Sequence, residues 1–252
     1  MKKLLAITAL SAALFFGQTA AAEEKAAVKP SHVEMVLVLD ESGSMSNLTN
    51  DTIGGFNSMI EKEKKLDVDA HVTTVLFNDQ YKMLYNRREL KDVRKMTDKD
   101  YTPGGMTALL DAVGRTIHKM DMVSGIHRKD KGNKVLFVII TDGEENDSRE
   151  YTYADVKKLI KDRQENAGWE FIFLGANIDA AAAAENLGID RDRAVKYKNT
   201  GSGVRANFKA VAELSDSLAK SGRVSDEWKE TVEKDEDDAA DKQSAAVTLH
   251  RR

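Results

Sequence analysis

Three short segments of the 252-residue chain carry oxygen-bearing side chains that could bind a metal ion. The first is Asp40-Glu41-Ser42-Gly43-Ser44, in which a carboxylate and two hydroxyls alternate directly after an apolar run. The others are Thr107, which follows Gly104-Gly105, and Asp142, which lies in Thr141-Asp142-Gly143. Carboxylate and hydroxyl oxygens suit a hard cation such as Mg²⁺, which demands octahedral geometry and keeps some of its waters. The pattern therefore predicts a site for a hard divalent cation.

The segments around these residues alternate between strand-like and helix-like patterns. Strands are expected over 34–40, 71–77, 81–85, 135–140, 171–174 and 193–197, and helices over 51–65, 107–120, 153–166, 178–187 and 204–220. This alternation predicts an α/β domain, roughly residues 33–220, with a doubly wound, mostly parallel central sheet and helices on both faces. A hairpin at 78–80 supplies one antiparallel edge strand. Ligands of such sheets bind beyond the carboxyl ends of the strands, where Asp40 and Asp142 are expected.

The same residues, in this order, resemble the von Willebrand factor type A (vWA) domain with its metal-ion-dependent adhesion site (MIDAS). The matching motifs are Asp-x-Ser-x-Ser at 40–44, Gly-Gly-x-Thr at 104–107 and Asp-Gly at 142–143. The resemblance covers the order of elements from about residue 33 to 220 and implies a Rossmann-like fold. It further implies that Ser42 and Ser44 bind the cation directly and that Asp40 and Asp142 act directly or through water. Thr107 would join or leave the ligands with the ligation state.

This resemblance also implies a function. The cofactor would be Mg²⁺, with Mn²⁺ or Ca²⁺ as alternatives, and an exposed Asp or Glu of a protein partner would complete the coordination. We therefore expect a secreted, metal-dependent protein-binding module for adhesion or assembly, without catalytic residues.

Two alternatives use the same residues. The first is a metal-dependent hydrolase or phosphotransferase in which Asp40 is the nucleophile or orients water. A phosphotransferase would want a second acid two residues later, where the chain has Ser42, and the chain has neither a nucleophile elbow nor a phosphate-binding loop motif. The second alternative is an assembly subunit that docks a motor or chaperone, which an export signal would disfavour.

The N-terminal segment predicts export. Lys2 and Lys3 precede an apolar run over 4–16, and Ala20-Ala21-Ala22 supplies small residues for cleavage near Ala22. The apolar run is shorter than the roughly 20 residues that span a bilayer, so we expect a signal peptide over 1–22 and a periplasmic or extracellular mature chain with no transmembrane segment. A spacer is expected over 23–32. Residues 221–252 are expected to form an acidic tail that is flexible or partly helical.

Charge and composition exclude several other classes. The net charge of −4 becomes −6 without Lys2 and Lys3 (−4 − 2), which excludes a global basic field for nucleic acid. The absence of Cys excludes disulfides and thiolate metal sites. The five His residues, at 32, 71, 118, 127 and 250, show no paired ligand spacing, so we expect no zinc site. Three acids, Glu144, Glu145 and Asp147, form either a solvated loop or a rim that favours a partner with Lys or Arg beside its carboxylate.

Overall fold

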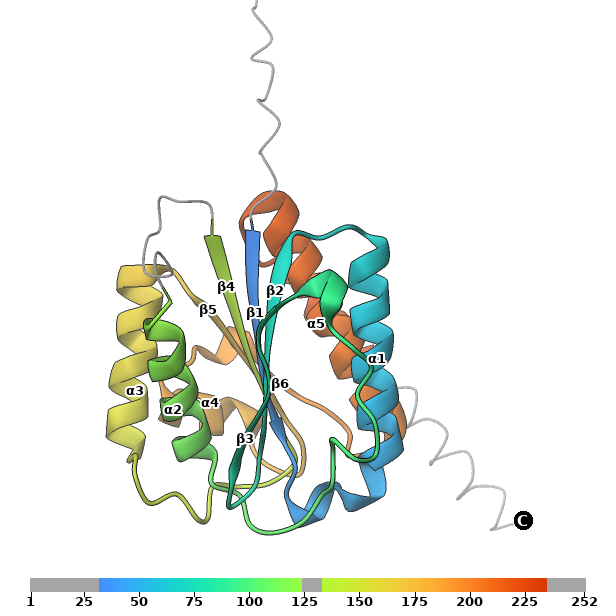
Figure 1. The fold of residues 1–252 in the computed structure, drawn as a ribbon. Coiled ribbons are helices and arrows are strands. Elements are labelled where there is room, and N and C mark those ends of the chain that lie inside the picture. The colour runs from blue at the N-terminus through green and yellow to red at the C-terminus, as the bar shows by residue number, and fades with distance from the viewer. Residues whose placement is uncertain (1–31, 124–132, 235–252) are drawn as a thin grey trace, which may run out of the picture.

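A computed structural model describes residues 32–123 and 133–234 (Figure 1). The expected signal peptide over 1–22 lies outside the described residues, as do most of the expected spacer, His127, His250 and residues 235–252. In the described part of the chain, no helix is both long enough and apolar enough to cross a membrane.

The described residues form a six-stranded sheet in the order β3-β2-β1-β4-β5-β6. The strands are β1 (His32–Asp40), β2 (Ala70–Phe77), β3 (Tyr81–Glu89), β4 (Asn133–Thr141), β5 (Glu170–Gly175) and β6 (Ala194–Lys196). All neighbouring pairs are parallel except β2 and β3, which form the antiparallel hairpin at the sheet edge. The predicted mostly parallel sheet with one antiparallel edge strand is confirmed.

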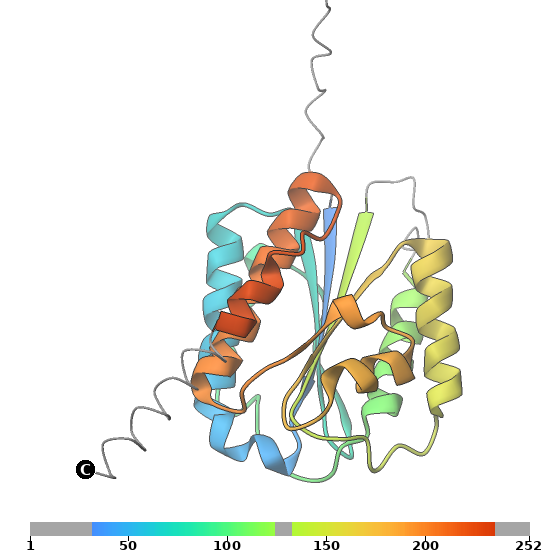
Figure 2. The same cartoon turned by 180° about the vertical axis from the view of Figure 1, so that it is seen from behind.

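Five α-helices cover the two faces of the sheet in the described part of the chain (Figures 1 and 2). They are α1 (Thr49–Lys65), α2 (Leu109–Asp121), α3 (Tyr153–Asp162), α4 (Ala180–Leu187) and α5 (Gly201–Ser221). Helices α1 and α5 pack together on one face, while α2, α3 and α4 lie on the other (Figure 1). A single π-helical turn, Arg163–Ala167, extends α3.

The central strands are buried on both faces, because successive side chains of a strand point to opposite sides. In β1, Met35 and Leu37 belong to the core under α1 and α5, whereas Val36 and Val38 belong to the core under α2, α3 and α4. This double burial is what a continuous apolar run in a parallel sheet predicts.

The strand order has a switch point between β1 and β4. From β1 the chain proceeds outward to β2 and β3, and then returns to the other side of β1 to form β4. The loops that leave β1 and β4 therefore diverge, and a crevice opens between them at the carboxyl ends of the two strands.

At the opposite, amino end of β1 and β2, the sheet brings two histidines together. His32 Nε2 and His71 Nδ1 are 2.8 Å apart, although the residues are 39 positions apart in the chain. Spacing along the chain gave no sign of this pair, because the pair arises from parallel pairing, which aligns Glu34 of β1 with His71 of β2, and because His32 lies two residues from Glu34 on the same side of the strand.

The packed region extends past the boundary expected at residue 220. Trp228 and Val232 are each only 1% exposed and belong to the core under α1 and α5. They lie in a helical segment over 228–234. Part of the expected tail is thus helical and docked, while residues 235–252 lie outside the described part of the chain.

Candidate metal centre

Two buried carboxylates face the crevice between β1 and β4. Asp40 is the last residue of β1 and is 1% exposed, and Asp142 follows β4 directly and is 2% exposed. Because β1 and β4 are parallel neighbours, their carboxyl ends lie side by side at the switch point. The two acids, 102 positions apart in sequence, thus reach one polar site.

The two serines of the Asp-x-Ser-x-Ser segment connect these carboxylates. The Ser42 backbone N–H donates to Asp40 Oδ1 over 2.7 Å, which closes the tight turn that leaves β1. Ser42 Oγ and Ser44 Oγ are 3.0 Å apart, and Ser44 Oγ donates to Asp142 Oδ1 over 2.5 Å. Ser44 is exposed whereas Ser42 is buried, so the oxygen cluster opens to solvent at Ser44.

Thr107 lies beside the same cluster but not within a helix. The helix α2 begins at Leu109, two residues later than expected, and places Thr107 in the preceding loop. A Cβ atom built on Gly143 would lie 3.6 Å from Thr107 Oγ1 and 4.0 Å from Ser44 Oγ, so the Thr107 hydroxyl borders the turn after Asp142. The structure therefore places all five predicted residues around one point.

Neither carboxylate is paired with a basic group of the described residues. Among residues 32–123 and 133–234, no Lys, Arg or His side chain lies within ion-pairing distance of Asp40 or Asp142. Burial raises the pKa of Asp40, and the nearby charge of Asp142 raises it further, against the hydrogen bonds from Thr141 and Ser42. Two unpaired acids in a buried site destabilise each other unless a positive charge is bound between them.

The donor set fits a hard divalent cation. In an octahedral Mg²⁺ site with ligands at about 2.1 Å, neighbouring ligand atoms lie about 3.0 Å apart, which is the separation of the two serine hydroxyls. Two buried polar atoms nearby, Tyr197 Oη and Asn199 Oδ1, also have no hydrogen-bond partner in the described part of the chain. Buried polar atoms without partners are rare and point to a bound water or ion.

Several residues that orient this site were not predicted. Thr141 Oγ1 donates to Asp40 Oδ2 over 2.6 Å, and Asn199 Nδ2 donates to Asp142 Oδ2 over 3.2 Å. The Tyr101 hydroxyl donates to the Asp40 backbone carbonyl over 2.6 Å. Only Thr141 carried a signal in the sequence, because it is the strand residue directly before Asp142; the other two come from distant loops.

The acidic loop after Asp142 has a largely structural role. Glu145 accepts hydrogen bonds from the backbone N–H groups of Leu110, Asp147 and Ser148, so it occupies the N-terminus of α2. Asn146 fixes Thr107 by accepting from its N–H over 2.8 Å and donating its own N–H to the Thr107 carbonyl over 3.0 Å. Of the three acids in this loop, only Glu144 is exposed.

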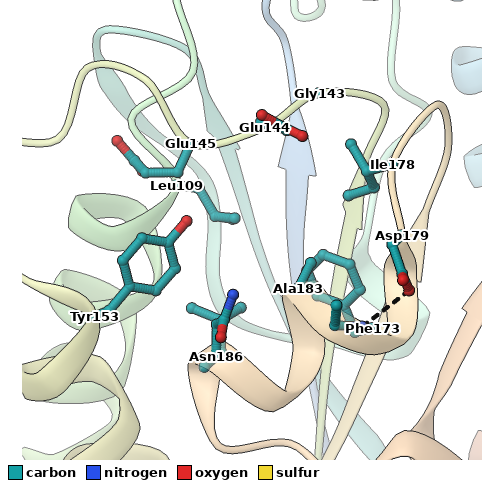
Figure 3. Close-up of a pocket in the computed structure, with 12 residues that line it drawn as sticks. Leu109, Gly143, Glu144, Glu145, Tyr153, Phe173, Ile178, Asp179, Ala183 and Asn186 are labelled. Carbon is teal, nitrogen blue, oxygen red and sulfur yellow. Dashed lines mark hydrogen bonds between the residues drawn. The ribbon is translucent and has the colours of Figure 1, made fainter.

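A pocket of about 260 Å³ adjoins the turn after Asp142 (Figure 3). On one side the pocket is lined by Tyr153 of α3. On the other side it is lined by Ala183 of α4 and by Asp179, which directly precedes α4. Gly143 and Glu144 lie on its edge. Asp179 caps α4 by accepting from the N–H of Ala182 over 3.0 Å. The lining thus includes the carboxylate of Glu144, which has no hydrogen-bond or ion-pair partner among the described residues and lies next to Gly143 in the chain.

Comparisons with known proteins agree with this architecture. A family model described as "vWA-TerF-like: vWA found in TerF C terminus" matches residues 32–191. No curated protein matches the chain.

Solved structures show the same fold. The chain is similar to the vWF domain of the type V pili tip protein Mfa5 from Porphyromonas gingivalis, at 12% identity over 78% of this chain and 99% of that chain, with a TM-score of 0.54. It is also similar to proximal thread matrix protein 1 from the mussel byssus, at 14% identity over 73% of this chain, with a TM-score of 0.52. The matched part is 45% of the byssus protein's chain. The pilus adhesin SpaC from Lactobacillus rhamnosus GG matches at 14% identity over 74% of this chain and 31% of that chain, with a TM-score of 0.54.

Proposed function

Since the chain belongs to the family of vWA domains found at the TerF C terminus, we propose that it is a metal-dependent protein-binding module for adhesion or assembly. In this proposal Ser42 and Ser44 bind a divalent cation directly, and Asp40 and Asp142 act directly or through water. Thr107 joins or leaves the ligands of the cation, depending on whether the partner's carboxylate is bound. The cation is Mg²⁺, with Mn²⁺ and Ca²⁺ as alternatives, and the mature chain acts in the periplasm or outside the cell.

The observation that carries this proposal is the pair of buried, unpaired carboxylates at the switch point. Two carboxylates balance the charge of Mg²⁺ formally, while neutral hydroxyls from Ser42, Ser44 and Thr107 add no negative charge. A cation held in this way still attracts an anionic ligand from outside. The exposed position of Ser44 leaves that side of the site accessible to a carboxylate on a partner protein.

The geometry favours binding over catalysis at Asp40. One carboxylate oxygen of Asp40 accepts from the Ser42 N–H and the other from the Thr141 hydroxyl, and the side chain lies beneath the serine loop. A nucleophile or general base needs an oxygen that the substrate can reach, whereas Asp40 is buried. Asp40 is instead held as a fixed acceptor, which suits an anchor for the loop and the cation.

The pocket of Figure 3 supports a preference among partners. Its edge lies next to Gly143, so a side chain that flanks the partner's metal-binding carboxylate can enter it. The exposed carboxylate of Glu144 favours Lys or Arg at that flanking position. We therefore propose a partner segment with an acidic residue beside a basic one.

Calorimetric titration tests the metal site. Mg²⁺ and Mn²⁺ are titrated into chelator-treated mature protein, with and without acetate as a stand-in for the partner's carboxylate. We expect one equivalent to bind, and we expect Asp40→Ala to abolish this binding. Asp147→Ala is the matched control, because it removes an acid from the neighbouring loop that pairs with Arg149 instead. Folded protein that binds neither ion, even with acetate, would contradict the proposal.

Partner binding is tested by a pull-down from an extract with and without chelator. We expect capture that depends on the divalent ion and is lost in Asp142→Ala, while circular dichroism shows that this variant stays folded. Capture that survives both the chelator and the substitution would place the binding surface elsewhere on the molecule.

A further inference from the structure

A second cluster of ligand-type side chains lies at the amino ends of β1 and β2, at the other end of the sheet from the Asp40 site. It consists of His32 and Glu34 of β1 and His71 of β2. Glu34 is 1% exposed, while the side chains of the two histidines are 19% and 27% exposed. Both histidines line a surface hollow of about 460 Å³, so the cluster can be reached from solvent.

The three donor atoms form a compact triangle. His32 Nε2 lies 2.8 Å from His71 Nδ1 and 3.3 Å from Glu34 Oε1, and His71 Nδ1 lies 3.4 Å from the same carboxylate oxygen. In a tetrahedral zinc site with ligands at about 2.0–2.1 Å, two ligand atoms are about 3.3 Å apart. The triangle is therefore close to one face of a zinc tetrahedron.

The ring of His32 is held by a carboxylate on its other side. His32 Nδ1 and Asp69 Oδ1 are 2.9 Å apart, so Nδ1 carries the proton that Asp69 accepts. In the metal-free protein Nε2 also carries a proton, which faces Glu34; a metal that displaces this proton meets a lone pair directed at His71 and Glu34. Histidines that bind metals commonly show this arrangement, in which a carboxylate fixes the tautomer and makes the ring a better ligand.

Arg87 of β3 shares the cluster. It projects from a position where the β2–β3 pairing is irregular, at a left-handed φ of 46°, and its guanidinium binds both oxygens of Glu34. Burial alone would raise the pKa of Glu34, but hydrogen bonds from His32 and Arg87 lower it to about 2, so Glu34 is ionised at neutral pH. Because the Arg87 side chain is 32% exposed, it can withdraw from Oε1 and retain the bond from Nε to Oε2.

We propose that His32, His71 and Glu34 bind a borderline divalent transition metal, with Zn²⁺ as the fitting ion and water as the fourth ligand. Imidazole nitrogens together with one carboxylate are the donor set that such ions take, and that Mg²⁺ does not prefer. Once the metal displaces the proton of His32, the two carboxylates of Glu34 and Asp69 face only one guanidinium, and the ion balances the remaining negative charge. This site is independent of the Asp40 site in position, in donor chemistry and in preferred metal.

The test is a calorimetric titration of Zn²⁺ into the mature protein at about pH 8, where the proton on His32 is more easily displaced. About 5 mM Mg²⁺ is present throughout to occupy the Asp40 site, which prefers hard ions. We expect one equivalent of Zn²⁺ to bind. His71→Ala removes a ligand and should weaken binding by about 100-fold or more, whereas His118→Ala removes an exposed histidine of α2 and should leave the affinity unchanged.

A further variant gives a result that misfolding cannot produce. Arg87→Gln removes the cation that competes for Glu34 and should strengthen Zn²⁺ binding by about 10-fold. Folded wild-type protein that binds no Zn²⁺ would overturn the proposal, as would equal binding by wild type and His71→Ala. Zn²⁺ binding that disappears in Asp142→Ala but persists in His71→Ala would assign the ion to the other site and also overturn it.

Discussion

Glu63 is a buried acid whose replacement should stabilise the protein at alkaline pH. It lies on α1 against α5, with no exposed surface, and Ser215 Oγ donates to its Oε2 over 2.8 Å, while its Oε1 has no partner among the described residues. Burial raises its pKa from 4.5 to about 7. The folded protein thus keeps the Glu63 proton up to a pH at which the unfolded chain has lost it.

The sign and size of the effect follow from this difference. Below about pH 4.5 both states are protonated, and the stabilisation from neutral Glu63 is fully present. Between about pH 4.5 and pH 7 the unfolded state binds fewer protons than the folded state, and the free energy of unfolding falls progressively by about 3 kcal/mol, at 1.36 kcal/mol for each pKa unit. Glu63→Gln stays neutral and can still accept the hydrogen bond from Ser215.

Thermal unfolding of wild type and Glu63→Gln from about pH 4 to about pH 8 measures this effect. We expect nearly equal stability at the acid end and an advantage for the variant of about 3 kcal/mol at pH 8, or roughly 6–12 °C in Tm for a domain of this size. Glu61→Gln removes a carboxylate from the same helix at a partly exposed position, and should change stability by less than about 0.5 kcal/mol. An advantage that does not grow with pH would refute the reasoning.

Three further predictions concern the metal centre and the C-terminal segment. Thr141→Val removes the hydroxyl that holds Asp40 and should reduce Mg²⁺ affinity by about 10–100-fold in calorimetry; unchanged affinity would show that this contact does not orient the site. Saturation with Mg²⁺ at about 100 times Kd should add about 2.7 kcal/mol of stability, seen as a rise in Tm that chelator reverses and that Asp142→Ala lacks. Trp228→Ala should lower the free energy of unfolding in urea by about 3–5 kcal/mol, because it empties a buried site; a loss below about 1 kcal/mol would mean that the segment is not docked.

The strands and most helices could be predicted because their signals are local. The continuous apolar run before Asp40 requires burial on both faces, and alternation with helical periodicity then leaves few arrangements for the sheet. The positions of Asp40 and Asp142 follow directly, since both stand at the ends of such runs. These residues are therefore placed correctly without any knowledge of tertiary contacts.

The features that the sequence did not predict depend on contacts between distant segments. The start of α2 is delayed to Leu109 because Asn146 binds the backbone of Thr107, and because the Ala108 N–H donates to the Asn78 carbonyl. Trp228 lies in an acidic stretch whose composition indicates a solvated tail, yet its single large aromatic side chain fills a gap in the core. The composition of the segment is dominated by its charged residues, whereas its packing against the core depends on this one tryptophan.

The two acids at the ends of β1 show why the Asp40 site calls for a cation. Glu34 and Asp40 are each 1% exposed and lie on the same strand, so burial acts on both. The pKa of Glu34 is nevertheless lowered, because His32 and Arg87 supply positive hydrogen-bond donors. The pKa of Asp40 is raised by burial and by Asp142, and its own hydrogen bonds, from Thr141 and Ser42, come from neutral groups. The protein balances the charge at one end of the strand with its own side chains and leaves it unbalanced at the other, beside exposed Ser44, where a divalent ion from solution can enter and balance it.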